Sequence, residues 1–172
     1  KKLIDDGFKN VILRTRKQLD LTNQEKTFKF LKRQKPKFVI LAAAKVGGIA
    51  ANAKFKDRFI YENIQIQNNV IHGSFLAGVK NLFLLGSSCI YPKNCKQPMK
   101  EKYLLTGPLE ETNDAYAIAK IAGLKMCEYY SKIYNLNFKT LMPPNLYGPN
   151  DNYDLNESHF FPALIKKIHV AK

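Results

Sequence analysis

Short apolar runs alternate along the chain with longer segments that have helical periodicity. The runs NVILRT at 10–15, FVILAA at 38–43, NLFLL at 81–85 and FKTLM at 138–142 each predict a strand. The run at 38–43 contains no polar residue, which is typical of a strand that is buried on both faces.

The segments between these runs predict helices. A capping box, Thr22-x-x-Glu25, predicts a helix that continues to about Gln34. Apolar residues at helical spacing predict a long amphipathic helix over 54–79, and a further helix is expected over 112–135.

A last amphipathic stretch at 160–168 completes the alternation of strands and helices. This order predicts an α/β fold with a doubly wound parallel sheet, right-handed crossovers and helices on both faces. Ligands of such sheets bind beyond the carboxyl ends of the strands. Small and polar residues follow the predicted strands at these ends, so we expect the functional site there.

Length and composition fit a single packed domain. The chain has 172 residues, of which 45% are hydrophobic, and no apolar run is long enough to span a membrane. No secretory signal pattern follows Lys1. The three cysteines form neither a disulfide framework nor a C-x-x-C pair, which favours a reducing cytosol, and no residue spacing indicates a metal site.

A net charge of +14 suggests an anionic partner, which could be a nucleic acid, a membrane surface or a phosphorylated small molecule. Only four of the 28 basic residues are arginine, and the lysines are scattered along the chain. Phosphate recognition favours the arginine fork, and groove reading favours clustered charge. We therefore expect no nucleic acid partner.

Tyr116 and Lys120 are the first candidates for chemistry. Their i, i+4 spacing places both on one face of the predicted 112–135 helix, about 6 Å apart. A neighbouring ammonium favours the phenolate and lowers the pKa of the phenol towards the range of acid–base catalysis. Ser87, at the end of a predicted strand, could hydrogen-bond the same substrate oxygen. Each residue alone is equally compatible with a structural role, and the combination carries the signal.

The motifs of the chain resemble those of the extended short-chain dehydrogenase/reductases that modify nucleotide sugars. Ser87, Tyr116 and Lys120 resemble the catalytic triad of this family. The resemblance spans nearly the whole chain and is carried by the following segments: LAAAKVGG at 41–48, GSSCIYP at 86–92, PM at 98–99, YAIAKIAG at 116–123 and NLYGP at 145–149.

The resemblance is most specific at Cys89 and His159, which match the branch that converts GDP-4-keto-6-deoxymannose to GDP-L-fucose. It implies that Cys89 is the base and His159 the acid in the inversion of C3 and C5. Tyr116 would then protonate the C4 oxygen during reduction, while Ser87 orients the ketone. Lys120 would hold the nicotinamide ribose. Each of Cys89 and His159, taken singly, could equally be structural.

The expected cofactor is NADPH. Arg14 and Arg16 lie at the end of the first predicted strand, where an NAD enzyme would carry an acidic residue, and arginine suits the 2′-phosphate. By resemblance Arg16 is the phosphate contact, and the residues that border the adenine are Lys17, Gln18, Leu19, Asp20 and Leu21. Those expected around the nicotinamide half are Leu85, Gly86, Ser87, Ser88, Pro143, Pro144, Asn145 and Leu146, with His159 and Lys120.

Two departures from the family pattern affect the expectations. Lys167 stands where the family has an arginine that grips the substrate diphosphate, and it lacks the bidentate fork. The glycine-rich turn that cradles the pyrophosphate is absent, and residues 1–9 resemble the tail of the helix that follows it. In the order 3-2-1-4-5-6, the strands at 10–15 and 81–85 would then flank an empty slot.

We therefore expect residues 1–172 to be a partial NAD(P)-binding Rossmann domain, with 150–172 leading towards a substrate domain. The expected whole is an enzyme roughly twice as long. The resemblance implies that it is a homodimer through a helix pair that includes 54–79 and 112–135. We expect the fragment alone to be inactive.

Two other functions remain open. A sibling nucleotide-sugar epimerase or dehydratase would tolerate loss of Cys89 and His159, whereas a basic, non-catalytic binding fragment would not need Tyr116. Cys95, Cys127, His72 and His169 match no role in the family, and structural or surface positions are expected for them.

Overall fold

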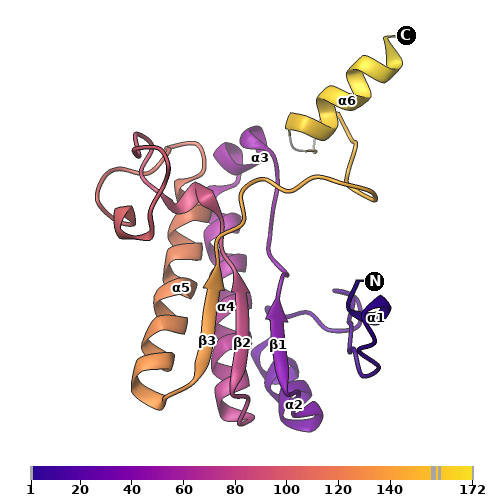
Figure 1. Ribbon diagram of the computed structural model, residues 1–172, viewed down its shortest axis with the longest axis vertical. Coiled ribbons are helices and arrows are strands. Elements are labelled where there is room, and N and C mark those ends of the chain that lie inside the picture. Colours follow the sequence, from indigo (N-terminus) through magenta and orange to yellow (C-terminus); the bar gives the residue numbers. More distant parts are fainter. Residues whose placement is uncertain (1, 156–157, 159, 172) are drawn as a thin grey trace.

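Three parallel strands form the sheet of this computed structural model, which describes residues 2–155, 158 and 160–171. Strands β1 (Phe38–Leu41), β2 (Asn81–Leu85) and β3 (Asn137–Leu141) lie side by side in the order β1-β2-β3 (Figure 1). Leu41 lies opposite Leu84, and Leu85 opposite Leu141. The carboxyl ends of all three strands therefore meet at one edge of the sheet, as the doubly wound α/β class predicted.

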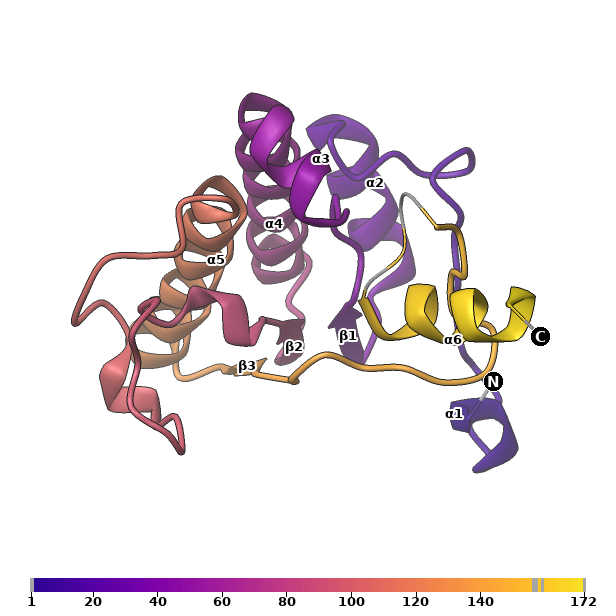
Figure 2. The same ribbon diagram turned by 90° about the horizontal axis from the view of Figure 1, so that it is seen from above.

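The main helices cover one face of this sheet. They are α2 (Gln24–Gln34), α4 (Lys56–Leu76) and α5 (Asp114–Tyr134), all on the same side of the strands (Figure 2). The expectation of helices on both faces is wrong for the described residues. Phe38 and Ile40 of β1 point to the other face and stay 50% and 52% exposed. The shorter elements are α1 (Lys2–Asp5), α3 (Ile49–Lys54), α6 (Phe160–Val170) and the 3-10 turns η1 (Ser88–Ile90) and η2 (Glu101–Tyr103).

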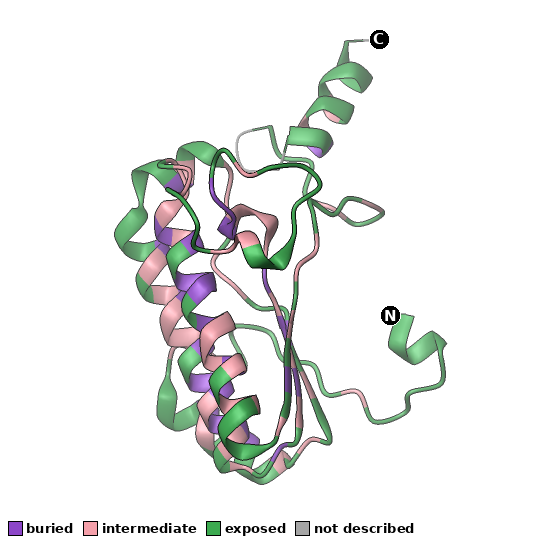
Figure 3. Ribbon diagram, turned by 60° about the vertical axis from the view of Figure 1, so that its left-hand side comes forward, coloured by how far each residue is buried: buried purple, intermediate pink, exposed green. Residues whose placement is uncertain are grey.

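The core lies between the sheet and the pair α4 and α5. Ile71, Leu82 and Leu84 are fully buried there, and Cys127 and Phe138 nearly so. Buried residues run along the inner faces of these helices, whereas α1 and α6 are mostly exposed (Figure 3). Cys127 thus has the structural role expected for it, and burial raises the pKa of its thiol to about 12.

Helix α4 buries carboxamides as well as apolar side chains. Asn63, Gln67 and Asn69 are at most 1% exposed. Gln67 donates to the Ala119 carbonyl of α5 at 2.9 Å, and Asn69 donates to the Leu21 carbonyl at 2.8 Å. Buried amides are stable only when they are hydrogen-bonded, so these contacts fix α4 against its neighbours.

The start of α2 differs from the sequence prediction. Asn23 is the N-cap, and its side chain accepts a hydrogen bond from the Lys26 N–H at 2.9 Å. Thr22 instead donates its hydroxyl and its backbone N–H to the carboxylate of Asp20. The Thr22–Glu25 capping box is therefore wrong by one residue, because the Asp20 turn uses Thr22 first. The expected end at Gln34 is confirmed.

The predicted strand at 10–15 does not form, and β1 pairs directly with β2. The expected slot therefore does not separate residues 10–15 from β2. It lies at the other edge of β1, where a groove of about 560 Å³ has Ile12, Leu13 and Val39 among its lining residues. A strand is held by backbone hydrogen bonds to a neighbouring strand. Residues 10–15 face this groove and pair with no strand in the described part of the chain, so they remain irregular.

Candidate functional site

Ser87 and Cys89 lie directly beyond the carboxyl end of β2. Ser87 keeps an extended backbone, and its Oγ accepts a hydrogen bond from the Cys89 N–H at 3.3 Å, which opens the turn η1. This local capping places the serine hydroxyl and the cysteine thiol on one short turn. The turn packs against α5, the helix that carries Tyr116 and Lys120.

Gly86 explains how this turn lies so close to β3. Its N–H donates to the Leu141 carbonyl at 2.7 Å. A Cβ at position 86 would stand 2.6 Å from the Met142 sulfur and 3.0 Å from the Leu141 oxygen. Only glycine allows this approach of the two strand ends. Gly86 therefore determines the position of Ser87, the next residue, relative to β3.

Lys120 is a buried cation in the first half of α5. It is 2% exposed, and its Nζ donates to the Leu85 carbonyl oxygen at 2.9 Å. Nζ lies 5.8 Å from the centroid of the Tyr116 ring, which confirms the predicted proximity of the two residues. Burial lowers the pKa of Lys120 to about 8, because the charged form loses its hydration.

Tyr116 is held in its neutral form. Burial raises the pKa of its phenol to about 12, and the nearby Cys89 adds to the rise. A hydrogen bond with the Ser87 side chain acts in the opposite direction. The sequence predicted a lowered pKa from the Lys120 ammonium, and this prediction is wrong because burial raises the pKa. A phenol that keeps its proton is suited to donate it to a developing alkoxide.

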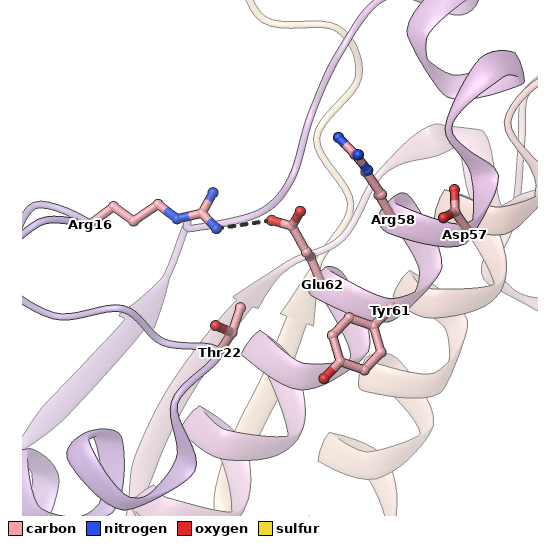
Figure 4. Close-up of a pocket in the computed structure, with 6 residues that line it drawn as sticks. All are labelled: Arg16, Thr22, Asp57, Arg58, Tyr61 and Glu62. Atoms are coloured by element: carbon pink, nitrogen blue, oxygen red, sulfur yellow. Dashed lines mark hydrogen bonds and ion pairs between the residues drawn. The ribbon is translucent and has the colours of Figure 1, made fainter.

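Arg16 lies on the other side of the carboxyl edge, against α4. Its Nη2 is 3.2 Å from Glu62 Oε2, and Lys45 Nζ is 3.9 Å from Glu62 Oε1. Arg16 and Glu62 border a pocket of about 510 Å³ (Figure 4). The residues that line the pocket are Arg16, Thr22, Asp57, Arg58, Tyr61 and Glu62.

The expected adenine-bordering residues, 17–21, form the turn that follows Arg16. Thr15 and Gln18 close this turn through a 3.0 Å hydrogen bond. The carboxyl of Asp20 accepts hydrogen bonds from Thr22, and these lower its pKa. Leu19, Asp20 and Leu21 line the groove along β1 together with Arg16.

The remaining site predictions lie outside this arrangement. Residues 143–146 follow β3 directly and are mostly exposed. Lys167 is exposed on α6, a helix that extends away from the sheet in Figure 1, and the structure does not bring it to Tyr116. His159 lies outside the described residues.

Side chains without a predicted role are structural or exposed, as expected. The Nδ1 of His72 is 2.7 Å from the Tyr130 hydroxyl, within an aromatic group that includes Phe75. Cys95 packs beside the cluster around Ile90, and His169 is exposed on α6. No group of three potential ligands among the described residues is arranged to hold a metal ion. No described helix has the length and hydropathy needed to cross a bilayer.

Sequence reasoning missed Glu62 and Asn63. Asn63 accepts a hydrogen bond from the Lys45 N–H at 2.9 Å and donates to the Lys45 carbonyl at 3.0 Å, as a neighbouring strand would. It thereby holds the loop after β1 at the carboxyl edge. The available signal was a run of amides at positions 63, 67 and 69 inside an otherwise amphipathic helix.

Several GDP-L-fucose synthases are similar to this sequence over nearly its whole length. The GDP-L-fucose synthase of Sinorhizobium fredii is 59% identical over 162 residues, which cover 94% of this chain and 52% of the relative. A putative GDP-L-fucose synthase 2 of Arabidopsis thaliana is 55% identical over 172 residues, 100% of this chain and 52% of that protein. The chain thus spans about half the length of these relatives.

Solved structures show the same fold. A GDP-D-glycero-L-gluco-heptose synthase from Campylobacter jejuni, determined in the presence of NADPH, matches with a TM-score of 0.95 and 49% identity. The match covers 99% of this chain and 50% of that one. A Naegleria fowleri GDP-L-fucose synthetase bound to NADP matches with a TM-score of 0.87 and 28% identity, over 99% and 56% of the two chains.

The model of one protein family matches residues 1–172, the full sequence. The solved neighbours confirm the Rossmann-like class that the strand order predicted. The chain belongs to the NAD dependent epimerase/dehydratase family.

Proposed function

We propose that this chain is the cofactor-binding half of an enzyme that converts GDP-4-keto-6-deoxy-D-mannose to GDP-L-fucose by 3,5-epimerisation and NADPH-dependent 4-reduction. The observation that carries this proposal is the gathering of Ser87, Cys89, Tyr116 and Lys120 beyond the carboxyl end of β2. The 59% identity to the Sinorhizobium fredii relative supports the choice of substrate.

The donor groups of the chain fit a dinucleotide phosphate. The Lys120 ammonium has three N–H donors, and within the described residues one of them is bound to the Leu85 carbonyl oxygen. Its other donors suit ribose hydroxyls. Arg16 borders the pocket against α4, where its guanidinium suits a 2′-phosphate. When bound, the nicotinamide cofactor supplies the hydride that reduces the C4 ketone.

Tyr116 and Ser87 perform the proton chemistry of this reduction. The Ser87 hydroxyl holds the ketone oxygen beside the phenol, with which it already forms a hydrogen bond. Tyr116 donates its proton as negative charge develops on that oxygen. Lys120, buried next to the ring, stabilises the phenolate that remains. The raised pKa of Tyr116 keeps the phenol protonated until negative charge develops on the ketone oxygen.

Cys89 is the proposed base of the epimerisation. Its thiol is free and partly buried, two residues beyond Ser87, so it shares the turn that holds the ketone. As the thiolate, Cys89 removes the carbon-bound proton next to the ketone and becomes the thiol, and the ketone oxygen takes the charge as an enolate. His159 returns a proton to the opposite face. The proposed roles of residues 143–146 beside the nicotinamide and of Lys167 on the diphosphate remain part of this proposal.

A specific observation favours a second candidate. A GDP-6-OMe-4-keto-L-xylo-heptose reductase of Campylobacter jejuni is 49% identical over the same part of its chain, with a TM-score of 0.95. A related GDP-sugar, reduced at C4 without inversion at C3 and C5, is therefore the alternative substrate. Tyr116 would still be required for that reaction, whereas Cys89 and His159 would not.

The test uses a chimera in which residues 1–172 replace the matching segment of the Sinorhizobium fredii relative. Turnover is followed as NADPH oxidation with GDP-4-keto-6-deoxymannose, and the product is identified by NMR. We expect GDP-L-fucose from the chimera and loss of C3 and C5 inversion in Cys89→Ser and His159→Asn. Turnover of a GDP-heptose alone, unaffected by these two substitutions, would reject the first proposal in favour of the second.

We also infer that the whole enzyme is a cytoplasmic homodimer. Three free thiols support a reducing compartment. Apolar side chains on the outer faces of α4 and α5 support the contact, since Tyr61, Ile118, Tyr129 and Ile133 are 64%, 46%, 54% and 71% exposed. Such a patch on two adjacent helices fits a second copy of the same pair.

A further inference from the structure

Glu62 is a partly buried carboxylate between two cations that come from different parts of the chain. Its side chain is 19% exposed, while those of Arg16 and Lys45 are 67% and 35% exposed. Each carboxylate oxygen is directed to one of the two cations. Figure 4 shows the carboxylate at the Arg16 side of the pocket, joined to the guanidinium. The least mobile charge of this group is therefore the negative one.

The backbone around Glu62 is fixed by its neighbour. Asn63 binds both backbone groups of Lys45 and also donates to the Phe59 carbonyl at 2.8 Å. Glu62 consequently stays at the pocket whether or not Arg16, a long and exposed side chain, remains beside it. An anion that binds Arg16 in the position seen here approaches this carboxylate, because the guanidinium lies 3.2 Å from Glu62 Oε2.

We propose that Glu62 sets the preference of this site between NADPH and NADH. The inference rests on the proposed function, in which Arg16 binds the 2′-phosphate. The carboxylate repels the 2′-phosphate and competes for Arg16, so it weakens NADPH binding. The same carboxylate can accept a hydrogen bond from a free 2′-hydroxyl, which is the usual role of an acidic residue in NAD sites.

Other groups at the pocket modulate this balance without replacing Glu62. Arg58 contributes a second guanidinium, which also lies 5.4 Å from the centroid of the Phe55 ring, and Asp57 contributes a second carboxylate. The neighbouring Lys56 is directed to Asp114 of α5, with 2.9 Å between its Nζ and the Asp114 Oδ1. Glu62 is the pocket carboxylate that contacts Arg16 in the described part of the chain.

The experiment measures dissociation constants of NADPH and NADH for the chimera by isothermal titration calorimetry, without substrate. The variant is Glu62→Gln, which keeps the size and one acceptor oxygen but removes the charge. We expect the ratio of NADPH affinity to NADH affinity to rise by about three- to tenfold, with the larger change at low ionic strength. Titration with 2′-AMP and 5′-AMP isolates the contribution of the 2′-phosphate.

Glu128→Gln is the matched control. Glu128 also bridges two cations, Lys125 at 2.9 Å and Lys132 at 2.7 Å, but it lies on α5 away from the pocket. We expect its affinity ratio to equal that of the unmodified chimera. A ratio within twofold of the unmodified value in Glu62→Gln, or a shift towards NADH, would overturn the inference. Absence of binding by either cofactor in the unmodified chimera would instead reject the proposed function.

Discussion

The Lys120 ammonium donates a hydrogen bond of 2.9 Å to the carbonyl oxygen of Leu85, which joins α5 to the last residue of β2. This bond fixes the distance between the helix that carries Tyr116 and the turn that carries Ser87. A buried cation is costly unless it is paired or hydrogen-bonded. Its presence at the end of a strand marks a position that is kept for chemistry as well as for packing.

Tyr116→Phe separates the two half-reactions. Removing the phenolic proton donor should lower the rate of C4 reduction in the chimera by about 10²- to 10⁴-fold. Exchange of C3 and C5 hydrogens with deuterated solvent should continue, because Cys89 and His159 remain. Mass spectrometry of the recovered substrate measures that exchange.

The control for this substitution is Tyr129→Phe, which removes the same hydroxyl from a residue 54% exposed on α5. It should leave reduction unchanged. Equal losses of reduction and exchange in Tyr116→Phe would show that the phenol acts on both steps, contrary to the assignment.

The charge of Lys120 gives a pH dependence. With a pKa of about 8, the ammonium loses its proton as pH rises through that value. Reduction should therefore fall above about pH 8 if the cation stabilises the phenolate. Single-turnover rates of reduction between pH 6 and pH 10 test this prediction. If the fall in rate above pH 8 is also seen in Lys120→Met, it belongs to another titrating group.

The same pKa predicts a trend in stability. Lys120 has its ordinary pKa of 10.5 when unfolded and about 8 when folded. Between these values the unfolded state binds more protons, so stability should rise with pH, by at most about 1.4 kcal/mol per pH unit. Urea unfolding of the chimera beside its Lys120→Met variant isolates this contribution. An unchanged difference between the two across this interval would contradict the lowered pKa.

Asn63→Ala tests how the loop after β1 is held. The substitution leaves the backbone N–H and carbonyl of Lys45 without their partner, which should cost about 1–3 kcal/mol of unfolding free energy. Asn68→Ala, one turn further along α4 and exposed, is the control. Equal urea midpoints for the two variants would mean that water satisfies Lys45 equally well.

Ile133→Lys tests the proposed dimer. Ile133 is 71% exposed on α5, so the new charge should not disturb the monomer. Placed in an apolar interface it should shift the chimera from dimer to monomer. Light scattering after size-exclusion chromatography measures the mass, and a dimer that survives unchanged would place the interface elsewhere.

The sequence was sufficient to predict features that depend only on the spacing of nearby residues. The strand at Asn81–Leu85 has the predicted limits, and Tyr116 and Lys120 share a helix face, because both follow from residue spacing alone. The strand at 10–15 failed because a strand depends on a partner that spacing cannot supply. The pKa of Tyr116 was predicted in the wrong direction because burial is a property of the packed structure.

The role of α4 was also hidden from the sequence. Asn63, Gln67 and Asn69 are polar, and hydrophobic patterning assigns polar residues to a solvent-facing side. Their burial depends on backbone groups of distant segments, at Lys45, Ala119 and Leu21, that become adjacent only in the fold. Glu62 was missed for the same reason.

The unpaired edge of β1 has a consequence for handling this polypeptide. β1 is the edge strand of the sheet in the described part of the chain, and its Phe38 and Ile40 are half exposed near a groove with apolar and charged lining residues. Edges of this kind pair readily with strands of other molecules. We therefore expect edge-to-edge association of this polypeptide at high concentration, and Ile40→Lys should reduce it.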